Sequence, residues 1–315
     1  MKLLITSNSF ASCDTEPYER LVAGGFEITR NPYRRPLTES ELIALLNDKE
    51  ALLLSVELLS RRVIEQCPKL MVVSRYGVGT DNVDVDALEE KGILLEVTRE
   101  ANSDSVADHT IGLMIDVAHK ICYEACHYRQ GVFLKTRGQD LYQSTVGIIG
   151  LGAIGRRVAR RLKGFDCRIL VHDHHYDGDV IEAEALEMAS LDEIFTTSDF
   201  VSLHLPSTPL TRGLVDRERL ASMKKNALLI NTARGDLVDK TALLEALENK
   251  QIGGYGADVG FQEPMTDDEF RSFNNVVITP HSAALTVGSI NRMSALAADN
   301  LLKHHAHILN MKGET

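Results

Sequence analysis

A glycine-rich loop between two apolar segments is the feature that most constrains the fold of this chain. Gly150, Gly152 and Gly155 follow an apolar run at 146–149 and open a helical stretch. In a strand-turn-helix unit the first glycine permits a tight turn, the second lets a pyrophosphate approach the backbone, and the third allows close packing. The helix N-terminus then offers its N–H groups and positive dipole end to the phosphates. The spacing therefore predicts a dinucleotide site.

Asp173 indicates which dinucleotide the loop binds. It directly follows a second apolar run, Arg168–His172. A carboxylate at this place accepts hydrogen bonds from the ribose hydroxyls of NAD and repels the 2′-phosphate of NADP. Ala153 and Ile154, inside the glycine loop, are uncharged, so the phosphates depend on backbone donors. We therefore expect NAD as the cofactor.

Strand-like and helical segments alternate along the chain, which is typical of parallel α/β sheets. The alternation comes in two series. The first has strand-like runs at 3–6, 26–29, 51–56, 70–74 and 93–97, and the second at 145–149, 168–172, 200–205, 227–231, 255–259 and 276–279. We expect two doubly wound parallel-sheet domains, one flavodoxin-like and one a nucleotide-binding Rossmann domain, with a cleft between them.

Two long helix candidates indicate where the chain passes between these domains. One starts at Ser105, which has capping-box spacing to Asp108, and the other spans Val287–Leu309. We expect residues 1–101 and 285–315 to form a substrate domain and residues 102–284 the NAD-binding domain. Ligands bind at the carboxyl ends of parallel strands and at domain junctions, so the cleft is the expected active site.

Composition excludes several classes of protein. A net charge of −11 argues against binding to nucleic acids or anionic membranes. No apolar run approaches the roughly 18 residues that cross a membrane, and the run at 3–5 is too short for an export signal. Five scattered cysteines suit reduced thiols in the cytoplasm. Cys122 and Cys126 are one helical turn apart, but such thiols more often pack, so we expect no metal.

Three polar residues follow late strands of the second series: Arg234, Glu263 and His281. Taken singly, each has an ordinary structural explanation, as an ion-pair residue, a loop carboxylate or a capping histidine. Their context favours chemistry, because Arg234 stands in Asn-Thr-Ala-Arg-Gly after one buried strand and His281 in Thr-Pro-His after another.

The motifs together resemble the D-isomer-specific 2-hydroxyacid dehydrogenases, the family of phosphoglycerate, glycerate and D-lactate dehydrogenases. The resemblance spans nearly the whole chain. It is carried by the segments 75–84, 102–108, 145–155, 204–211, 231–236, 258–264 and 279–283.

This resemblance implies a role for each residue. Arg234 would bind the substrate and polarise its 2-keto oxygen, and His281 would be the general acid, oriented by Glu263. The step of five residues from Asp258 selects Glu263 over the adjacent Gln262. The substrate carboxylate would lie at Arg75, Val78 and Gly79. Further cofactor contacts would come from Val106, His204, Pro206, Thr211, Thr232, Ala233 and Asp258.

The sequence departs from the family at positions that bear on the substrate. Arg99 and Glu100 replace the usual Pro-Gly, and the loop at 54–57 lacks the arginines of phosphoglycerate enzymes. A phosphate there would meet Glu57, an unfavourable like-charge contact unless Arg75 or Arg99 compensates it. We expect a small 2-keto or 2-hydroxy acid, with hydroxypyruvate, glyoxylate and 3-phosphoglycerate as candidates.

Two other functions fit part of the pattern. An NAD-sensing corepressor on the same fold can keep Arg234, Glu263 and His281, but such proteins usually carry long disordered extensions, which we do not see here. NAD enzymes of the alanine dehydrogenase or homocysteine hydrolase type need a different residue set around the nicotinamide. The resemblance also implies a homodimer that pairs through the nucleotide-binding domains, using the helix after Ser105.

Overall fold

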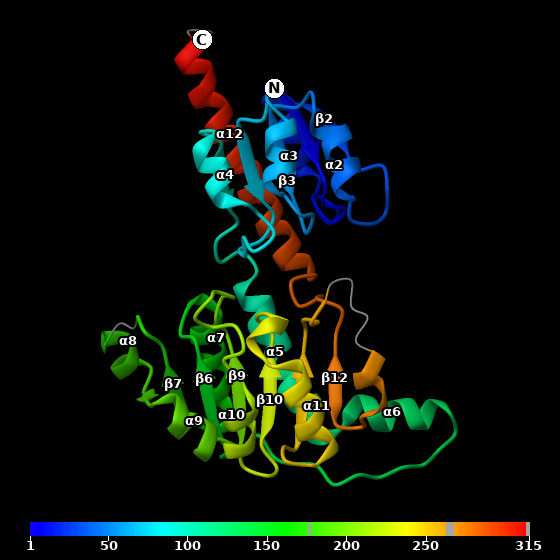
Figure 1. Ribbon diagram of the computed structural model, residues 1–315, viewed down its shortest axis with the longest axis vertical. Coiled ribbons are helices and arrows are strands. Elements are labelled where there is room, and N and C mark those ends of the chain that lie inside the picture. Colours follow the sequence, from blue (N-terminus) through cyan, green and yellow to red (C-terminus); the bar gives the residue numbers. More distant parts are fainter. Residues whose placement is uncertain (176–177, 263–267, 313–315) are drawn as a thin grey trace. The chain divides into compact units, whose positions relative to one another are not determined.

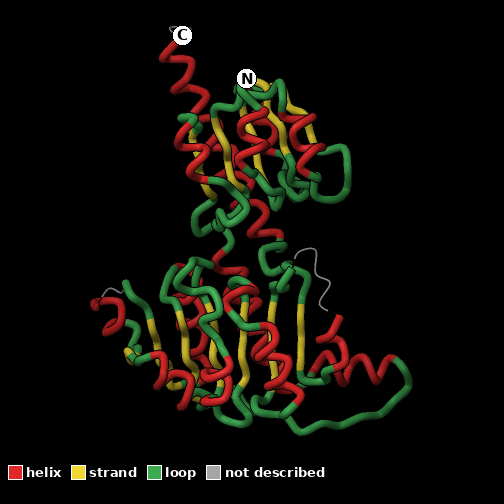
Figure 2. The backbone as a smooth tube through the Cα atoms, viewed as in Figure 1, coloured by secondary structure: helices red, strands yellow, loops and turns green. Residues whose placement is uncertain are grey.

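The computed structural model describes residues 1–175, 178–262 and 268–312, and the chain divides into two compact units. Unit 1 comprises Met1–Asn102 and Leu285–Thr315, and unit 2 comprises Ser103–Ala284. Each unit is built on one β-sheet with helices on both of its faces (Figures 1 and 2). The two predicted parallel α/β sheets are confirmed.

Unit 1 has a five-stranded sheet in the order β2-β1-β3-β4-β5, and every neighbouring pair is parallel. This is the flavodoxin-like order, which reverses direction between β1 and β3. The strands are β1 (Lys2–Ile5), β2 (Glu27–Arg30), β3 (Ala51–Leu54), β4 (Val72–Arg75) and β5 (Leu94–Val97).

The helices of unit 1 bury their apolar sides against both faces of this sheet. Residues of α2, α3 and α4 pack on β3 and β4 in one hydrophobic cluster, whereas α1 and α12 contact each other and α12 contacts β4. All four residues of β3 are buried, as a central parallel strand requires. The helices are α1 (Glu16–Ala23), α2 (Glu39–Leu46), α3 (Arg61–Gln66), α4 (Val85–Glu90) and α12 (Val287–Lys312).

Unit 2 has a seven-stranded parallel sheet in the order β12-β11-β10-β9-β6-β7-β8. This is the Rossmann order extended by one strand, with its reversal between β6 and β9. The strands are β6 (Thr145–Ile149), β7 (Arg168–His172), β8 (Glu187–Met188), β9 (Phe200–Leu203), β10 (Leu228–Asn231), β11 (Gly254–Ala257) and β12 (Val276–Ile278). The sequence predicts six of these, and β8 is the addition.

Two hydrophobic clusters cover the faces of the second sheet. One lies beneath α9, α10 and α11, and the other beneath α5 and α7. The helices of this unit are α5 (Ser103–His119), α6 (Ile121–Arg129), α7 (Ala153–Leu162), α8 (Gly178–Ala183), α9 (Leu191–Thr197), α10 (Arg217–Ser222) and α11 (Lys240–Glu248), with 3₁₀ turns η1 (Lys163–Phe165), η2 (Gly235–Leu237) and η3 (Asp268–Ser272).

The predicted start of the long helix at Ser105 is wrong by two residues. Helix α5 begins at Ser103, so Ser105 lies inside the helix and cannot cap it. The side chain of Asp108 instead forms an ion pair with Arg161 of α7, at 2.6 Å. The capping-box spacing of Ser105 and Asp108 is therefore a coincidence, since Asp108 links α5 to α7.

Parallel pairing sets where functional side chains collect. All carboxyl ends of a parallel sheet lie at the same edge, so the loops after β6, β7, β9, β10, β11 and β12 share one edge of unit 2. The loops after β1, β3 and β4 share the corresponding edge of unit 1. Among the helices described here, none is long and apolar enough to cross a membrane.

Candidate functional site

The glycine loop after β6 has the geometry that its sequence predicts. Gly150 has φ +99°, and a Cβ there would lie 2.6 Å from the carbonyl oxygen of His204. A Cβ on Gly155 would lie 2.0 Å from the carbonyl oxygen of Gly150. Both positions therefore exclude any side chain, one through backbone conformation and the other through close packing of helix on strand.

Gly152 differs from these two glycines because no atom lies within 4 Å of its potential Cβ. It is the N-cap of α7, which continues with Ala153 and Ile154. The first N–H groups of a helix have no partner within it, and none is found for Ala153 or Ile154 in the described chain. Open space beside N–H donors at a dipole-positive helix end fits a pyrophosphate.

The Asp173 carboxylate lies against this loop. One oxygen accepts a hydrogen bond from the Leu151 N–H at 2.6 Å, and the other accepts from the His175 N–H at 2.9 Å. The carboxylate follows β7, the neighbour of β6, so it lies beside the helix N-terminus where a ribose attached to the phosphates would come.

His204 follows β9, on the other side of β6. Its Nε2 lies 2.9 Å from the Ser202 hydroxyl, whereas its Nδ1 is buried with no hydrogen-bond partner. Burial lowers the pKa of His204 to about 4, so the imidazole is neutral near pH 7. In the loop that follows, the Thr211 hydroxyl donates to the Pro206 carbonyl at 2.7 Å.

The loop after β10 carries Arg234 and is held by a buried amide. Asn231 is fully buried; its Nδ2 donates to the Arg234 carbonyl at 2.7 Å, and its Oδ1 accepts from the Ala233 N–H at 3.0 Å. The Arg234 guanidinium donates to the Ala233 carbonyl at 2.7 Å. A Cβ on Gly235 would lie 2.1 Å from the Gly260 carbonyl oxygen, so this loop and the one after β11 are in close contact.

Helix α5 reaches the same edge through a pair of threonines. The Thr232 hydroxyl lies 2.9 Å from that of Thr110, which also donates to the Val106 carbonyl at 2.8 Å. The predicted residues Val106 and Thr232 are thus brought together through Thr110.

The Asp258 carboxylate organises the loop after β12. It is 2% exposed, and one oxygen accepts from the Thr279 hydroxyl at 2.6 Å and the Ser282 N–H at 2.8 Å. The other oxygen accepts from the Ala283 N–H at 2.8 Å. Between these donors stands His281, which is exposed and has φ +51°. The third predicted catalytic residue, Glu263, lies outside the described residues.

In unit 1, the loop after β4 holds Arg75, Val78 and Gly79. Arg75 points back at its own loop, because Nε donates to the Gly79 carbonyl at 3.0 Å and Nη1 to the Tyr76 carbonyl at 2.5 Å. The N–H groups of Val78 and Gly79 form no hydrogen bond within the described chain. The N–H groups of Val78 and Gly79 thus stay available as donors, whereas the Gly79 carbonyl is bound by Arg75.

Glu57 lies at the point where the unit 1 sheet reverses direction. It is 3% exposed, and its carboxylate accepts from the Thr6 hydroxyl at 2.6 Å and the Leu37 N–H at 3.4 Å. Thr6 directly follows β1, and the Asn82 amide donates to the Glu57 carbonyl at 2.7 Å. A buried anion therefore occupies the loop where phosphoglycerate enzymes are expected to place arginines. Glu100 adopts φ +59° where the family usually has glycine.

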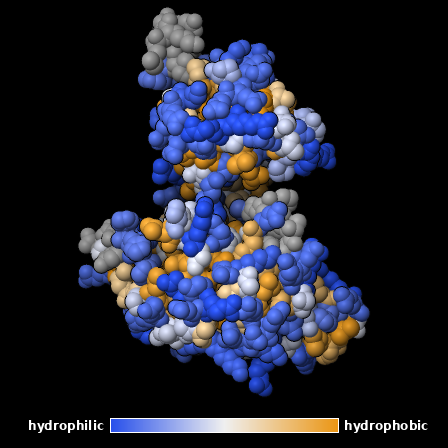
Figure 3. Space-filling view, viewed as in Figure 1, coloured by the Kyte–Doolittle hydropathy of each residue, from blue (hydrophilic) through white to orange (hydrophobic). Residues whose placement is uncertain are grey.

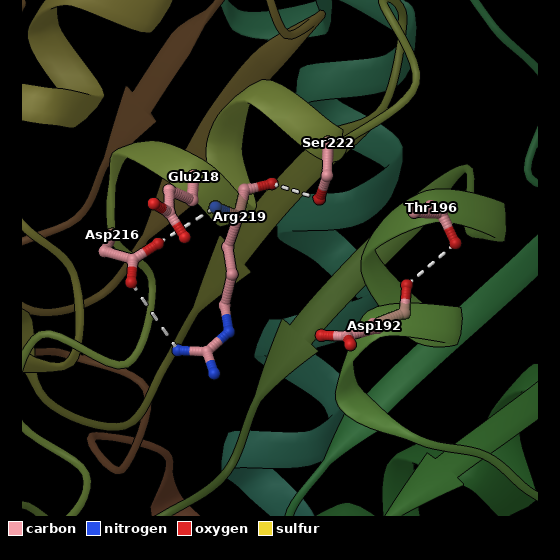
Figure 4. A pocket seen from close by; sticks show the side chains of 6 residues that line it. All are labelled: Asp192, Thr196, Asp216, Glu218, Arg219 and Ser222. Atoms are coloured by element: carbon pink, nitrogen blue, oxygen red, sulfur yellow. Dashed lines mark hydrogen bonds and ion pairs between the residues drawn. The ribbon is translucent and has the colours of Figure 1, made fainter.

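A surface pocket of about 270 Å³ in unit 2 contains none of the predicted site residues (Figure 4). It is lined by Asp192, Thr196, Asp216, Glu218, Arg219 and Ser222 of α9, α10 and the preceding loop. The Asp216 carboxylate caps α10 by accepting from the Arg219 N–H at 2.9 Å. In this pocket, Asp216 thus caps a helix and forms an ion pair with Arg219.

Metal ligation has no support among residues 1–175, 178–262 and 268–312, where no three His, Cys, Asp or Glu side chains could hold an ion. All five cysteines are free thiols. A hydrogen bond to Asp116 and burial raise the pKa of Cys122 to about 11, so this thiol stays protonated.

The sequence interpretation missed residues that complete these contacts, chiefly Thr110, His109 and Thr279. His109 Nε2 lies 2.8 Å from the Thr279 hydroxyl oxygen. A signal was present, because His109 and Thr110 are polar residues on the sheet side of a largely apolar helix. Their partners are over a hundred positions away, beyond the reach of local spacing.

Comparison with known proteins finds a matching family and several relatives of this chain. A family profile, "D-isomer specific 2-hydroxyacid dehydrogenase, NAD binding domain", matches residues 111–283. D-3-phosphoglycerate dehydrogenase of Methanocaldococcus jannaschii is 38% identical over 271 residues, which are 85% of this chain and 52% of that protein. Glyoxylate reductase of Thermococcus kodakarensis is 36% identical over 288 residues, 88% of this chain and 86% of the reductase.

The chain thus spans about half the length of the phosphoglycerate dehydrogenase and most of the reductase. Among solved structures, the apo-structure of D-lactate dehydrogenase from Escherichia coli has a TM-score of 0.83 at 32% identity. That comparison covers 100% of this chain and 98% of the D-lactate dehydrogenase.

Proposed function

Because the chain belongs to the D-isomer specific 2-hydroxyacid dehydrogenase family, we propose that it interconverts a small 2-keto acid and its D-2-hydroxy acid with NAD(H). We assign cofactor binding to residues 102–284 and substrate binding to residues 1–101 and 285–315. The observation that carries the proposal is the shared carboxyl edge of the unit 2 sheet, where the glycine loop, Arg234, Asp258 and His281 all lie.

The glycine loop and Asp173 hold the cofactor in this proposal. Gly150 and Gly155 fix the turn, Gly152 leaves room for the pyrophosphate, and the N–H groups at the start of α7 bind it. Asp173 accepts hydrogen bonds from the adenosine ribose hydroxyls. This favours NAD over NADP, because NADP carries a phosphate at that ribose. When bound at this edge, the nicotinamide supplies or accepts the hydride. Contacts to the rest of the cofactor come from Val106, Ala153, Ile154, His204, Pro206, Thr211, Thr232, Ala233 and Asp258.

Substrate binding uses the donors that the family resemblance assigns to it. The N–H groups of Val78 and Gly79 hold the substrate carboxylate, and Arg75 keeps their loop in shape by binding two of its carbonyls. Arg234 binds and polarises the 2-keto oxygen, so that the developing negative charge meets a guanidinium.

His281 is the general acid in the reductive direction. It donates a proton to the substrate oxygen and takes it back in the oxidative direction. The family resemblance assigns to Glu263 the role of orienting the imidazole and stabilising its charged form. The bonds from Ser282 and Ala283 to Asp258 support this role, because they fix the backbone on the C-terminal side of His281.

The buried Glu57 favours an unphosphorylated substrate. A phosphate at the reversal point of the unit 1 sheet would face the Glu57 carboxylate. The nearby donors, the Thr6 hydroxyl and the Leu37 N–H, already bind that carboxylate and would not be available to the phosphate. We therefore propose hydroxypyruvate or glyoxylate in preference to 3-phosphoglycerate. The similarity to glyoxylate reductases over most of their length supports this choice.

We also propose a homodimer in the cytoplasm. Because α5, the helix after Ser105, has ten of its residues buried within unit 2, we place the pairing surface on the next helix, α6. Helix α6 buries none of its residues, and the exposed apolar side chains near it are Ile121, Tyr128, Val132 and Phe133. Figure 3 shows hydrophobic surface at the end of unit 2 where α6 lies. An apolar surface of this kind suits a second copy of the chain. The five free thiols support a reducing compartment.

The test is NADH oxidation with a panel of 2-keto acids: glyoxylate, hydroxypyruvate, pyruvate and phosphohydroxypyruvate. We expect robust turnover with one of the unphosphorylated acids and little with phosphohydroxypyruvate. Tight NADH binding without turnover of any acid would instead support a corepressor-like binding protein. A preference for the phosphorylated acid would refute the role given to Glu57.

A further inference from the structure

His109 of helix α5 contacts Thr279, in the loop after β12 that also carries His281. Building on the proposed function, we propose that His109 is a positioning residue that fixes Asp258 and the His281 loop through the hydroxyl of Thr279.

The three side chains form a short chain of hydrogen bonds. His109 Nε2 lies 2.8 Å from Thr279 Oγ1, and Thr279 Oγ1 lies 2.6 Å from Asp258 Oδ1. The direct distance from His109 Nε2 to Asp258 Oδ1 is 3.5 Å. Helix α5 packs on β11 and β12, which end just before Asp258 and Thr279, so the three groups are held by regular elements.

The direction of these bonds follows from counting hydrogens. A threonine hydroxyl has one hydrogen to donate. If His109 Nε2 carries a hydrogen, it donates to Thr279, and the threonine hydrogen goes to Asp258. If Nε2 lacks one, the single hydrogen of Thr279 is shared among three acceptors: His109, Asp258 and the Ala257 carbonyl, which lies 3.3 Å away. The 2.6 Å bond, short for a neutral pair and normal for a hydroxyl to a carboxylate, indicates the first arrangement.

This arrangement bears on His281 through the Asp258 carboxylate. Asp258 also accepts from the N–H groups of Ser282 and Ala283, so it holds the chain on both sides of His281. His281 has φ +51°, which a non-glycine residue keeps only when its surroundings determine it. Without the His109 donor, the Thr279 hydroxyl is free to turn toward the Ala257 carbonyl, 3.3 Å away, which weakens its bond to Asp258 and loosens the backbone that aims the imidazole.

A double-mutant cycle separates this role from packing. His109→Gln keeps a donor at nearly the position of Nε2, whereas His109→Met keeps the length and removes it. Thr279→Ser keeps the hydroxyl, and Thr279→Val replaces it with a methyl group. His119→Met, an exposed histidine at the end of the same helix, is the control.

We expect His109→Met to lower kcat about tenfold with the KM for the 2-keto acid little changed, a loss of about 1.4 kcal/mol. His109→Gln and Thr279→Ser should recover most of it, and His119→Met should have no effect. In the Thr279→Val background, His109→Met should cost nothing further, because its path to Asp258 is gone. Additive losses, or an unchanged kcat in His109→Met, would overturn the proposal.

A second readout does not depend on turnover. In protein labelled with ¹⁵N-histidine and free of cofactor, ring nitrogen shifts report the tautomer, and the His109→Gln spectrum assigns the signal. We expect His109 to carry its hydrogen on Nε2. A hydrogen on Nδ1 alone would overturn the inference, even in an active enzyme. Absence of wild-type turnover with every 2-keto acid would instead count against the proposed function, and the tautomer would still decide the inference.

Discussion

The carboxylate of Asp173 accepts a hydrogen bond from the Leu151 N–H at 2.6 Å, so the residue expected to select the cofactor is tied to the loop expected to bind its phosphates. The second oxygen is bound by the His175 N–H at 2.9 Å. Two backbone donors hold the carboxylate oriented toward the glycine loop. Cofactor choice and loop shape are therefore coupled in this chain.

The first prediction concerns cofactor choice. We expect the wild-type kcat/KM for NADH to exceed that for NADPH at least tenfold, since each tenfold needs only about 1.4 kcal/mol of unfavourable contact. Asp173→Asn removes the charge and should narrow the ratio by raising the NADPH value and lowering the NADH value. Asp166→Asn, at an exposed turn residue before β7, should leave the ratio unchanged. Equal wild-type values for the two cofactors would refute the assignment of Asp173.

The second prediction separates two glycines of one loop. Gly152→Ala places a methyl group in open space, so the melting temperature should stay near the wild-type value while the Kd for NADH rises at least tenfold. Gly155→Ala forces a methyl group to 2.0 Å from the Gly150 carbonyl oxygen and should lower the melting temperature as well.

Gly112→Ala, within α5 and with nothing near its potential Cβ, is the matched control and should preserve both quantities. Thermal unfolding and NADH fluorescence titration measure the set. Unchanged NADH affinity in Gly152→Ala would show that the pyrophosphate does not bind beside Gly152.

The third prediction is a pH dependence of stability. Burial lowers the pKa of His204 to about 4, whereas an unfolded histidine binds its proton near pH 6.5. Between these values the unfolded chain holds more protons, so this histidine makes the free energy of unfolding fall as the pH falls. The loss amounts to about 2 kcal/mol between pH 7.5 and 5.

His204→Gln removes this titration and should flatten the acid side of the stability profile by that amount. Urea unfolding of both proteins at the two pH values measures it. His307→Gln, an exposed histidine on α12, should leave the slope as in the wild type. A slope that persists in His204→Gln would show that other groups cause it.

The fourth prediction concerns the general acid. Reductive kcat/KM should fall as the pH rises, because a general acid has to hold its proton to act. His281→Ala should lower kcat by roughly 10² to 10⁴ without loss of NADH binding. Glu263→Gln should shift the falling limb to lower pH if Glu263 supplies the anion that the proposal pairs with the general acid. Near-normal turnover in folded His281→Ala, together with an unshifted limb in Glu263→Gln, would remove the pair from the mechanism.

The fifth prediction concerns assembly. Phe133 is 81% exposed and Tyr128 is 74% exposed. In a dimer that buries the α6 end of unit 2, Phe133→Ser with Tyr128→Ser should shift the mass toward a monomer in sedimentation at micromolar concentration. Leu210→Ser, on an exposed side chain in the loop after β9, should leave the mass unchanged. A monomeric wild-type protein would refute the homodimer.

Regular elements were predictable from the sequence because burial leaves a local pattern. The strand Leu228–Asn231 is buried throughout and its first three residues are apolar, a pattern typical of a strand covered on both faces. The edge strand Glu187–Met188 has no such pattern, since both residues are exposed. The glycine loop was predictable because each of its glycines meets a local requirement: a tight turn at Gly150, open space at Gly152 and close packing at Gly155.

The network around Asp258 was only partly predictable. The family resemblance points to Asp258 itself, but the contact between His109 and Thr279 joins residues 170 positions apart. Such a pair forms only when helix and sheet have been assembled, and neither residue is unusual in its own segment. The roles of Arg234, Glu263 and His281 stay predictions that the experiments above address.

The near-contact between Gly235 and the Gly260 carbonyl has a consequence for anyone who re-engineers this protein. The loop that follows Arg234 and the segment that follows Asp258 have no room for even one added carbon atom between them. Exchanging either loop with that of a relative would therefore fail unless the other is exchanged with it. For the design of new substrate preferences, the two loops are one transplantable unit.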